Sequence, residues 1–341
     1  MNQSNCIVAQ SGGPTVAINA SLAGVISGVK SSEKYDICYG AVNGILGILN
    51  ENYLNLSDIF ADDANLEKLK TTPAMYLGSC RHKLPDYKDD DSPYVYIFHQ
   101  FDKLSVKAFF YIGGNDSMDT VNKLSKYCKE NGVEDVFVVG APKTIDNDLV
   151  GTDHCPGFGS AAKYLAATFA ELERDCHVYE KKAVTIVEVM GRNAGYIALW
   201  CGIANGAEDI LLPERYDGNE QYLINRIIEN RKRGKKHHII INAEGIGHST
   251  SMARRIEAAT GIETRATIIG HIQRGGTPTC KDRVYASIMG ARAAELLAEG
   301  KSNRIVAYKD GKFVDFDIQE ALNMKKDIPE EQYEVSKLLV R

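Results

Sequence analysis

The segment from Gly140 to Asp148 reads GAPKTIDND and combines a lysine, a threonine and two aspartates. If the segment is extended, Asp146 and Asp148 point the same way, because alternate side chains of an extended chain share a face. One carboxylate could then accept a proton from a hydroxyl while the other helps to hold Mg²⁺, and Thr144 could bind a phosphate oxygen. The alternative is a polar turn at the surface whose charge Lys143 neutralises. The spacing therefore indicates either an ion pair or half of a phosphate-transfer site.

Two glycine pairs, in SGGPT at 11–15 and GGNDS at 113–117, each follow an apolar run and precede a helical pattern. Glycines let backbone N–H groups approach a phosphate, and a helix N-terminus favours negative charge. Asp116 would repel a phosphate charge about 4 Å away by roughly 4 kcal/mol at an effective dielectric near 20, so it would need a cation beside it. The alternatives are a turn without a ligand at the first pair and an N-cap by Asp116 or Ser117 at the second.

Arginines end the motifs EVMGR at 188–192 and GHIQR at 270–274, and Arg265 lies shortly before the second motif. The planar guanidinium suits a phosphate group. Each alone would be an ordinary surface arginine, but three at strand ends in one half of the chain favour a phosphate site. His271 could donate to a phosphate or sugar oxygen or have a purely structural role, and Glu244 could accept from sugar hydroxyls.

Apolar runs alternate with helical patterns along most of the chain, which predicts an α/β fold with parallel sheets and helices on both faces. Ligands of such folds bind at the carboxyl ends of strands, where each motif falls. Trp200 lies on an apolar helix pattern and is expected in the core. Strands are predicted at 5–10, 108–114, 136–140, 183–189, 237–245 and 265–272, and helices beginning near 18, 117, 159, 194, 218, 249 and 282.

The composition excludes several classes of protein. A length of 341 residues favours two domains, and a net charge of −5 gives no general attraction to nucleic acid or to an anionic membrane. The N-terminus does not resemble a signal peptide, and no apolar run approaches the ~18 residues of a membrane span. Eight scattered cysteines without a C-x-x-C pair fit reduced thiols in the cytoplasm. The absence of H-E-x-x-H disfavours a zinc hydrolase.

In this order and spacing, SGGPT, GGNDS, PKTIDND, EVMGR and GHIQRGG resemble the phosphofructokinase family, and the resemblance extends beyond KDRVYAS at 281–287. It implies two lobes, each a mainly parallel sheet with helices on both faces. It also implies Mg²⁺-assisted transfer of a phosphoryl group to the 1-hydroxyl of fructose 6-phosphate. The expected phosphoryl-donor lobe comprises residues 1–160 plus 275–322, and the expected fructose 6-phosphate lobe comprises 161–274 plus 323–341.

The resemblance also implies the role of each site residue. Asp146 is the expected base, and Arg265 matches a position contributed across a subunit boundary, which implies a homodimer or homotetramer. Asn115 and Asp148 are the expected metal ligands. The other expected catalytic residues are Thr144, Lys143 and Arg192. Fructose 6-phosphate is expected to contact Thr144, Asp146, Met190, Gly191, Arg192, Glu244, Arg265, His271 and Arg274. The donor is expected to contact Gly13, Arg81, Gly114, Asp116, Ser117 and Lys143, with Lys83 a rival to Arg81.

The family divides by phosphoryl donor. ATP users commonly have glycine where this chain has Asp116 and Lys143, whereas pyrophosphate users typically have aspartate and lysine, and we expect these two side chains to pair. Pro14 stands where many ATP users have aspartate. The resemblance favours a pyrophosphate-dependent enzyme that makes fructose 1,6-bisphosphate reversibly in glycolysis and gluconeogenesis. The alternatives are an ATP-dependent enzyme and a weakly active regulatory paralogue that binds sugar phosphate. A nicotinamide dehydrogenase is disfavoured by the lack of G-x-G-x-x-G.

Three features depart from the family pattern. Asn115 stands where an acidic metal ligand is usual, and its amide oxygen brings no charge. Ala183 replaces an arginine that bacterial ATP-dependent members supply across subunits, which a lysine of the pair 181–182 could replace. Ala23 and Ser27 stand where allosteric members have arginines for effector phosphates, so a weak response to such effectors is expected.

Overall fold

The computed structural model describes residues 4–178 and 183–339, which form two compact units. The first runs to Ile145 and adds Leu149–Ser160 and Gly275–Lys326, while the second contains Asp146–Asp148, Ala161–Arg274 and the chain from Asp327. The expected lobes differ from these units in two places. The last crossing follows Lys326 instead of residue 322, and the short segment Asp146–Asp148 groups with the second unit.

A mainly parallel sheet of seven strands forms the centre of the first unit. Its strands are β1 (Asn5–Gln10), β2 (Cys38–Ala41), β3 (Tyr53–Asn55), β4 (Val106–Gly113), β5 (Phe137–Pro142), β10 (Arg304–Lys309) and β11 (Lys312–Asp317). They are arranged in the order β11-β10-β5-β4-β1-β2-β3. The edge strands β3 and β11 are antiparallel to their neighbours, and the other neighbouring pairs are parallel. The three strands expected here lie within two residues of their predicted bounds.

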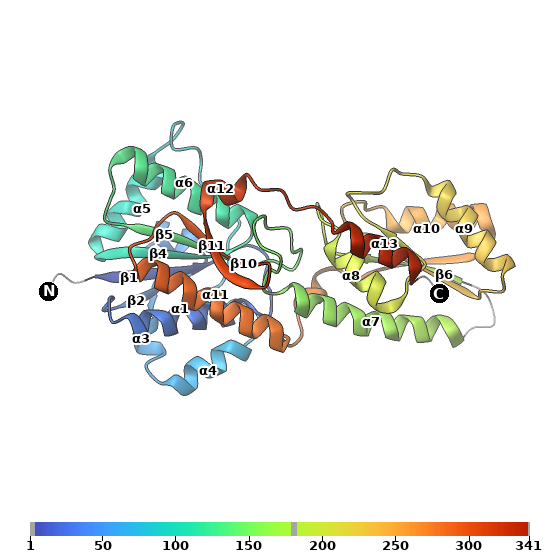
Figure 1. The fold of residues 1–341 in the computed structure, drawn as a ribbon, viewed down its shortest axis with the longest axis horizontal. Coiled ribbons are helices and arrows are strands. Elements are labelled where there is room, and N and C mark those ends of the chain that lie inside the picture. The colour runs from blue at the N-terminus through green and yellow to red at the C-terminus, as the bar shows by residue number, and fades with distance from the viewer. Residues whose placement is uncertain (1–3, 179–182, 340–341) are drawn as a thin grey trace. The chain divides into compact units, whose positions relative to one another are not determined.

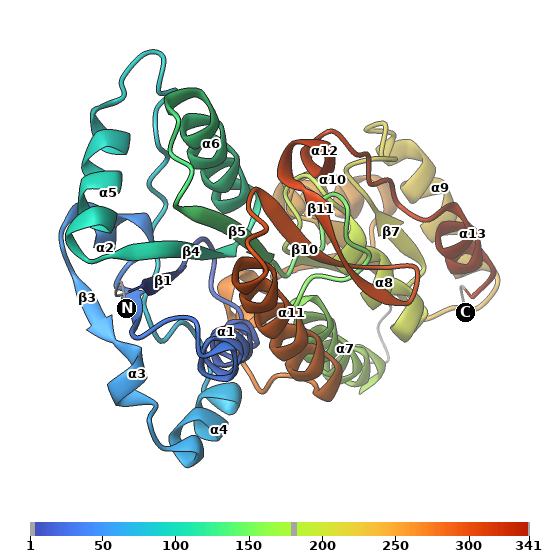
Figure 2. The same cartoon turned by 60° about the vertical axis from the view of Figure 1, so that its left-hand side comes forward.

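Helices cover both faces of this sheet, as the fold class predicted (Figures 1 and 2). The alternation of strand side chains divides the core, because Cys6 and Val8 face one layer while Ile7 and Ala9 face the other. The first layer contains α1 (Ile18–Ser32), α3 (Leu56–Ile59), α4 (Asp63–Thr71) and α11 (Cys280–Ala298). The second contains α2 (Ile45–Leu49), α5 (Ser92–Lys103), α6 (Asn115–Asn131) and α12 (Ile318–Leu322).

Helices α1 and α11 lie side by side although they come from opposite ends of the chain (Figures 1 and 2). Their backbones approach so closely that a Cβ on Gly24 would lie 2.1 Å from the Ser287 carbonyl oxygen. A Cβ on Gly290 would lie 2.1 Å from the Ser21 carbonyl oxygen. Any larger residue at either position would force the two helices apart, so these glycines fix the packing of this layer.

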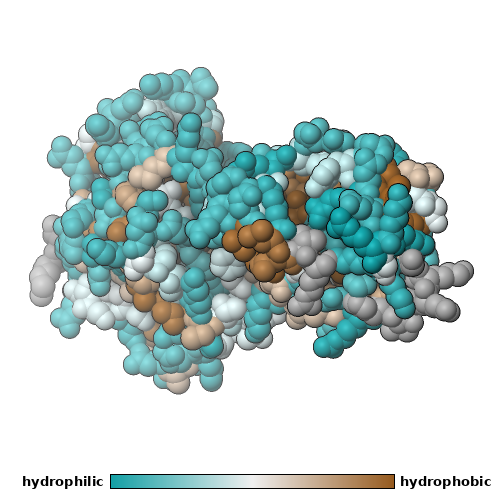
Figure 3. All heavy atoms as spheres, turned by 45° about the vertical axis from the view of Figure 1, so that its right-hand side comes forward, coloured by the Kyte–Doolittle hydropathy of each residue, from teal (hydrophilic) through white to brown (hydrophobic). Residues whose placement is uncertain are grey.

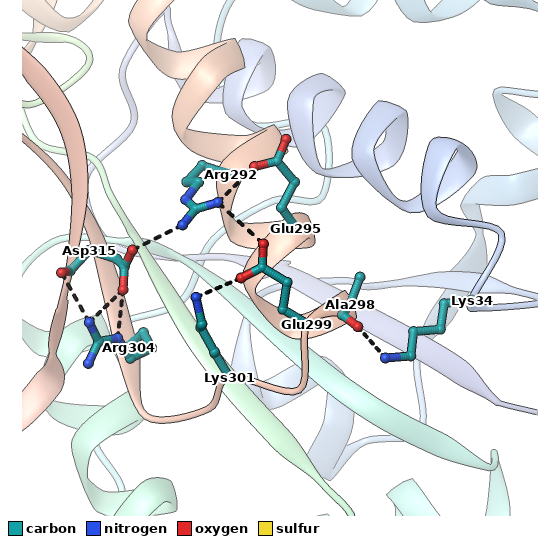
Figure 4. Close-up of polar contacts among 8 residues, drawn as sticks. All are labelled: Lys34, Arg292, Glu295, Ala298, Glu299, Lys301, Arg304 and Asp315. Carbon is teal, nitrogen blue, oxygen red and sulfur yellow. Dashed lines mark hydrogen bonds and ion pairs between the residues drawn. The ribbon is translucent and has the colours of Figure 1, made fainter.

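Ionic contacts fasten the end of α11 to β10 and β11 (Figure 4). The Asp315 carboxylate of β11 lies 2.5 Å from the Arg304 guanidinium and 3.3 Å from that of Arg292. Arg292 also contacts Glu295 and Glu299 on its own helix. This half-buried network joins three elements of the first unit.

The second unit contains a wholly parallel four-stranded sheet in the order β7-β8-β6-β9. Its strands are β6 (Ala183–Val189), β7 (Asp209–Leu211), β8 (His237–Ala243) and β9 (Glu263–Ile268). Helices α9 (Glu220–Lys232) and α10 (Ser249–Thr260) cover one face, whereas α8 (Tyr196–Asn205) packs against β7 and β8 and also against α13 (Glu330–Leu338). The long helix α7 (Phe158–Val178) leads into this unit. The predicted fold class of two mainly parallel α/β lobes is confirmed.

Two local predictions for the second unit are wrong. The strand expected at 265–272 is β9 at Glu263–Ile268, because the chain turns at Gly270, where φ is 62°, into the 3₁₀ helix η1 (Gly270–Arg274). Trp200 is 37% exposed instead of buried in the core. Its indole Nε1 donates to the Gln332 amide oxygen at 3.0 Å, so the ring lies on the side of α8 that meets α13.

The face of the molecule drawn in Figure 3 is mostly hydrophilic, with separate apolar areas. Within residues 4–178 and 183–339, every helix is too short or too polar to cross a bilayer. Six of the eight cysteines are buried, and Cys280 is exposed at the start of α11.

Candidate active site

The topology brings two of the predicted motifs and the first part of a third, up to Ile145, together in the first unit. Strands β1, β4 and β5 are parallel neighbours, so the loops that follow them begin at the same edge of the sheet. These loops carry SGGPT, GGNDS and PKTIDND. The chain leaves β1 toward β2 on one side and β4 lies on the other, which creates a switch point where α/β proteins bind ligands.

Lys143 connects all three loops from a buried position. Its side chain is 1% exposed, its backbone N–H donates to the Gly113 carbonyl at 2.9 Å, and its Nζ donates to the Gly13 carbonyl at 2.8 Å. A Cβ on Gly12 would lie 3.0 Å from Nζ, so the loop after β1 passes close to the ammonium. Because the lysine is buried, the alternative of an exposed ion pair is wrong. The arrangement places a cation within the glycine-rich loops.

The second loop leads directly into α6, which begins at Asn115 with Gly114 as its N-cap and without a side-chain cap. The alternative in which Asp116 or Ser117 is the N-cap is therefore wrong. Ser117 is 2% exposed and lies beneath Gly113, where an added Cβ would be 1.9 Å from its Oγ. Asn115 and Asp116 are exposed in the first helical turn, where backbone N–H groups and the helix dipole favour an anionic ligand.

The expected pairing of Asp116 with Lys143 is also wrong. The Asp116 carboxylate lies 2.8 Å from Lys83 Nζ, and hydrogen bonding and charge from Asp116 raise the pKa of Lys83 above its ordinary value. The segment before Lys83 is held against the loop after β1, since Ser11 Oγ donates to the Cys80 carbonyl at 3.2 Å. Arg81 is exposed in the same segment. Lys83, considered above only as a rival to Arg81, is thus the ion-pair partner of Asp116.

The segment that carries the expected base is not extended throughout. Thr144 forms an isolated parallel bridge with Gly157, whereas Asn147 adopts the left-handed conformation with φ of 55°. The turn at Asn147 lies between the two aspartates, so the alternation argument for Asp146 and Asp148 does not apply. Both carboxylates are half-buried.

Three loops of the second unit converge in the same manner at the ends of β8, β6 and β9, which are adjacent strands. The Glu244 N–H donates to the Val189 carbonyl at 2.8 Å, which joins the first two loops. Gly191 allows the turn after β6, because its φ is 124° and an added Cβ would lie 2.3 Å from the Ala194 carbonyl oxygen. The motifs NAEG, EVMGR and GHIQR therefore share one edge of the sheet.

Gln273 is a positioning residue that sequence reasoning missed. Its side chain is buried, its amide oxygen accepts from the Met190 N–H at 3.1 Å, and its Nε2 donates to the Gly270 carbonyl at 2.8 Å. It thereby fixes η1 against the loop after β6. The signal in the sequence was its place between the ligand candidates His271 and Arg274, since a polar residue that becomes buried there needs hydrogen-bond partners.

The side chains expected at the sugar phosphate differ in exposure. Arg192 and His271 are exposed, Glu244 and Arg274 are half-buried, and Met190 and Gly191 are buried. Arg265 lies within β9 and not at a strand end, so that part of the prediction is wrong. It belongs to the edge strand of its sheet and lies 2.6 Å from Glu263.

The expected metal ligands bring oxygen atoms but no closed protein cage. No group of three or more His, Cys, Asp or Glu side chains in the described parts of the chain could hold a metal ion. Asn115 supplies an amide oxygen and Asp148 a carboxylate oxygen. Each is of a type that fits Mg²⁺, which commonly binds one or two carboxylates and completes its shell with water and substrate phosphates.

The positions that depart from the family pattern have clear surroundings. Ala23 is fully buried in the α1–α11 layer, and Ser27 is half-buried on the same helix. Because Ala23 is fully buried, an arginine at this position would have to displace its core neighbours. Ala183 is the first residue of β6, and the lysine pair 181–182 lies outside the described residues.

Comparison with known proteins agrees with this arrangement. Residues 5–297 match the family described as Phosphofructokinase. The chain is 37% identical over 338 residues to an ATP-dependent 6-phosphofructokinase of Clostridium acetobutylicum, covering 97% of this chain and 98% of the relative. It is 39% identical over 334 residues to the enzyme of the same name from Bacillus cereus, with the same coverage.

Solved structures with pyrophosphate-dependent names are also similar. The pyrophosphate-dependent phosphofructokinase of Nitrosospira multiformis has a TM-score of 0.86 and 29% identity, covering 98% of this chain and 91% of that one. The corresponding protein of Marinobacter aquaeolei has a TM-score of 0.84 and 29% identity, covering 99% and 91%. The family match spans all the loops described above, and so the chain belongs to the phosphofructokinase family.

Proposed function

We propose that this phosphofructokinase moves a phosphoryl group from pyrophosphate to the 1-hydroxyl of fructose 6-phosphate, giving fructose 1,6-bisphosphate. The observation that carries the choice of donor is the buried ammonium of Lys143, which lies 2.8 Å from the Gly13 carbonyl oxygen among the glycine-rich loops. Pyrophosphate is small and highly charged, and it has no nucleoside to supply binding energy. A fixed cation at the loops replaces that energy through Coulomb attraction, which is strong where water is excluded.

Asp116 and Lys83 supply the selection against ATP. Asp116 lies in the first turn of α6, where it repels any additional phosphate that a longer donor brings. The Lys83 ammonium at 2.8 Å offsets this charge when the shorter pyrophosphate is bound. Lys143 therefore attracts the donor, and the exposed Asp116–Lys83 pair disfavours donors that are longer than pyrophosphate. Gly13, Gly114 and Arg81 complete the proposed donor side, together with Ser117 through its backbone.

Asp146 is the proposed general base, because phosphoryl transfer still needs an acceptor for the hydroxyl proton. Thr144 lies beside the transferred group in this proposal. Asn115 and Asp148 are the proposed ligands of Mg²⁺, which when bound neutralises the negative charge of the phosphates. Proton transfer itself is assigned to the carboxylate of Asp146.

The loops of the second unit are the proposed site for the sugar phosphate. Arg192, His271 and Arg274 offer cations and hydrogen-bond donors to the 6-phosphate and the sugar, and Glu244 accepts from hydroxyls. Met190 and Gly191 line the site through the turn after β6.

A shared site in a cytoplasmic homo-oligomer is part of the same proposal. Arg265 lies on the edge strand β9, where a side chain can reach a second copy, and Ile268 and Ile272 nearby are 57% and 60% exposed. Light scattering on the purified protein measures the number of subunits, and a monomer would remove the cross-subunit role of Arg265.

ATP is the second candidate donor, because the similar enzymes of C. acetobutylicum and B. cereus are named ATP-dependent. A coupled assay of the purified protein with fructose 6-phosphate and Mg²⁺, and with either pyrophosphate or ATP, separates the two. The proposal expects kcat/KM to be at least tenfold higher with pyrophosphate. A preference for ATP would overturn the choice of donor, and no transfer from either donor would favour the regulatory paralogue.

A further inference from the structure

A buried carboxylate at the start of α11 holds together two distant parts of the first unit. Asp282 is 0% exposed, and its carboxylate accepts from Ser160 Oγ at 2.5 Å and from the Ser160 N–H at 2.7 Å. His154 Nε2 lies 2.7 Å from its other oxygen. Because an ionised carboxylate only accepts, His154 donates from Nε2 in this arrangement. Asp282 thus receives one hydrogen bond from the loop that follows the PKTIDND motif and two from Ser160 in the first turn of α7.

The same network closes on the N-terminus of α11. Thr279 is the N-cap, and its side chain accepts from the Asp282 N–H at 3.1 Å, while its own N–H donates to Ser160 Oγ at 3.0 Å. Ser160 is the last residue of the first unit before the chain enters the second, and Gly275 is the first on its return. The network therefore ties the outgoing chain to the returning chain within the first unit.

Further contacts extend this network to Thr144, shortly before the expected base. The loop 149–157, which leads into α7, is also fixed by Thr152, whose hydroxyl accepts from the Tyr308 N–H of β10 at 3.0 Å. At Gly157 the loop bridges Thr144 on one side and meets Thr15 of the first glycine-rich loop on the other, where a Cβ would lie 2.6 Å from Thr15 Cγ2. Asp146 follows Thr144 by two residues along the chain. Contacts therefore connect Asp282 and the loop to Thr144, and the backbone connects Thr144 to the base.

Packing alone does not account for a charged group at this place. A buried carboxylate is costly unless several donors satisfy it, and an apolar side chain would fill the space without that cost. What the carboxylate adds is direction, since its three donors fix both the side chain of His154 and the backbone of Ser160. This is the type of support that holds a reacting group within a fraction of an ångström.

We propose that Asp282 is a positioning residue for Asp146, acting through His154, Ser160 and the Thr144–Gly157 bridge. The inference rests on the proposed role of Asp146 as the base, and it holds for either phosphoryl donor. Asp282 touches no substrate in this proposal. Its effect is on how often the base segment is correctly placed, and so on kcat more than on KM.

The test compares Asp282→Asn with Asp146→Asn and with the double variant, using whichever donor the wild-type enzyme prefers. Asp282→Asn is expected to lower kcat about 10–100-fold, the cost of a small misplacement of a catalytic group, with both KM values within threefold. The double variant is expected to match Asp146→Asn alone, because a lost base gains nothing from being positioned. Wild-type kcat in Asp282→Asn, or losses that multiply fully in the double variant, would overturn the proposal.

Asp315→Asn is the matched control, because it also removes one charge from a hydrogen-bonded carboxylate of the first unit (Figure 4). It is expected to lower the melting temperature without lowering kcat. Ser160→Ala, which keeps the Ser160 N–H bond to Asp282, is a milder second variant and is expected to lower kcat about threefold to tenfold.

Hydrogen exchange gives a readout that does not need activity. Amides of residues 144–157 are expected to exchange at least tenfold faster in Asp282→Asn or Ser160→Ala, and at the wild-type rate in Asp315→Asn. Unchanged exchange in that segment would refute the positioning role even if the wild-type protein proved to transfer no phosphoryl group. An inactive wild type with accelerated exchange would instead refute the proposed function alone.

Discussion

Replacing Lys143 with methionine is the sharpest test of the donor assignment. The lysine is 1% exposed, and methionine retains most of the volume of its stem, so the loops around it keep their packing. What disappears is the ammonium that donates to the Gly13 carbonyl at 2.8 Å. Assaying this variant with pyrophosphate and with ATP distinguishes two roles for Lys143. It is either a cation that binds pyrophosphate or a lysine that only supports the loops.

Two contributions give the size of the expected losses, one in stability and one in transition-state binding. A hydrogen bond to a charged group contributes roughly 1.5–3 kcal/mol to stability, and its loss lowers the melting temperature. The attraction between the ammonium and a phosphate charge about 4 Å away is roughly 4 kcal/mol at an effective dielectric near 20, an upper bound for the loss in transition-state binding. Allowing for solvent, we expect a loss of about 2–4 kcal/mol, or about 30–1,000-fold in kcat/KM for pyrophosphate.

Lys123→Met provides the control for this measurement. Lys123 Nζ also donates to a backbone carbonyl, that of Leu84 at 2.9 Å, and it pairs with Asp119 at 2.8 Å on α6. Steady-state kinetics with varied pyrophosphate should leave Lys123→Met within threefold of wild type. If Lys143→Met also stays within threefold, or if it loses no more than the control, the buried ammonium does not bind the donor and the argument fails.

Three other predictions follow from the described contacts and sequence features. Asp146→Asn should lower kcat by about 10²–10⁴, with fructose 6-phosphate affinity nearly unchanged, and a near-normal kcat in steady-state assays would remove Asp146 as the base. Because Ala23 and Ser27 supply no cations for effector phosphates, sugar-phosphate saturation curves should stay hyperbolic with or without ADP or phosphoenolpyruvate, and sigmoidal curves relieved by ADP would contradict this. Burial would raise the pKa of Asp315, but hydrogen bonding and charge from Arg304 and Arg292 outweigh it and lower the pKa. The stability from the contacts of Asp315 with the two arginines is therefore complete above the unfolded pKa of about 4 and is lost as pH falls through the folded pKa. The free energy of urea unfolding of Asp315→Asn should therefore converge on that of the wild type in acid. Parallel curves of stability against pH would refute this prediction.

Local pattern was sufficient for the architecture and for the identity of the loops. The apolar runs end where β1, β4, β5, β6 and β8 end, within two residues, because a buried parallel strand must stop where glycine and charge begin. Adjacency of the motifs followed from the rule that ligands collect at carboxyl ends of strands. The strand order then made these loops neighbours.

Partners across long stretches of chain could not be predicted in the same way. Asp116 was assigned to Lys143 because pyrophosphate users typically have aspartate and lysine at these two positions, yet its partner is Lys83 in a segment without a regular pattern. The assumption of an extended segment failed at Asn147, which has the left-handed conformation. Asparagine tolerates this conformation, but its presence in a sequence does not show that it adopts it. The prediction for Trp200 failed for another reason. Its apolar helix pattern does not show that α13 packs beside it and leaves the ring partly exposed.

The packing of α1 against α11 has a consequence for how the protein is made. Helix α1 leaves the ribosome early, but the helix that covers it, and the strand β10 that pairs with β5, emerge only as synthesis reaches residue 309. From residue 160 to residue 309 is 149 residues, which at roughly 5–20 residues per second takes about 7–30 s. Throughout that interval the nascent first unit exposes the apolar face of α1 and an unpaired edge of β5, a window in which chaperone binding competes with aggregation.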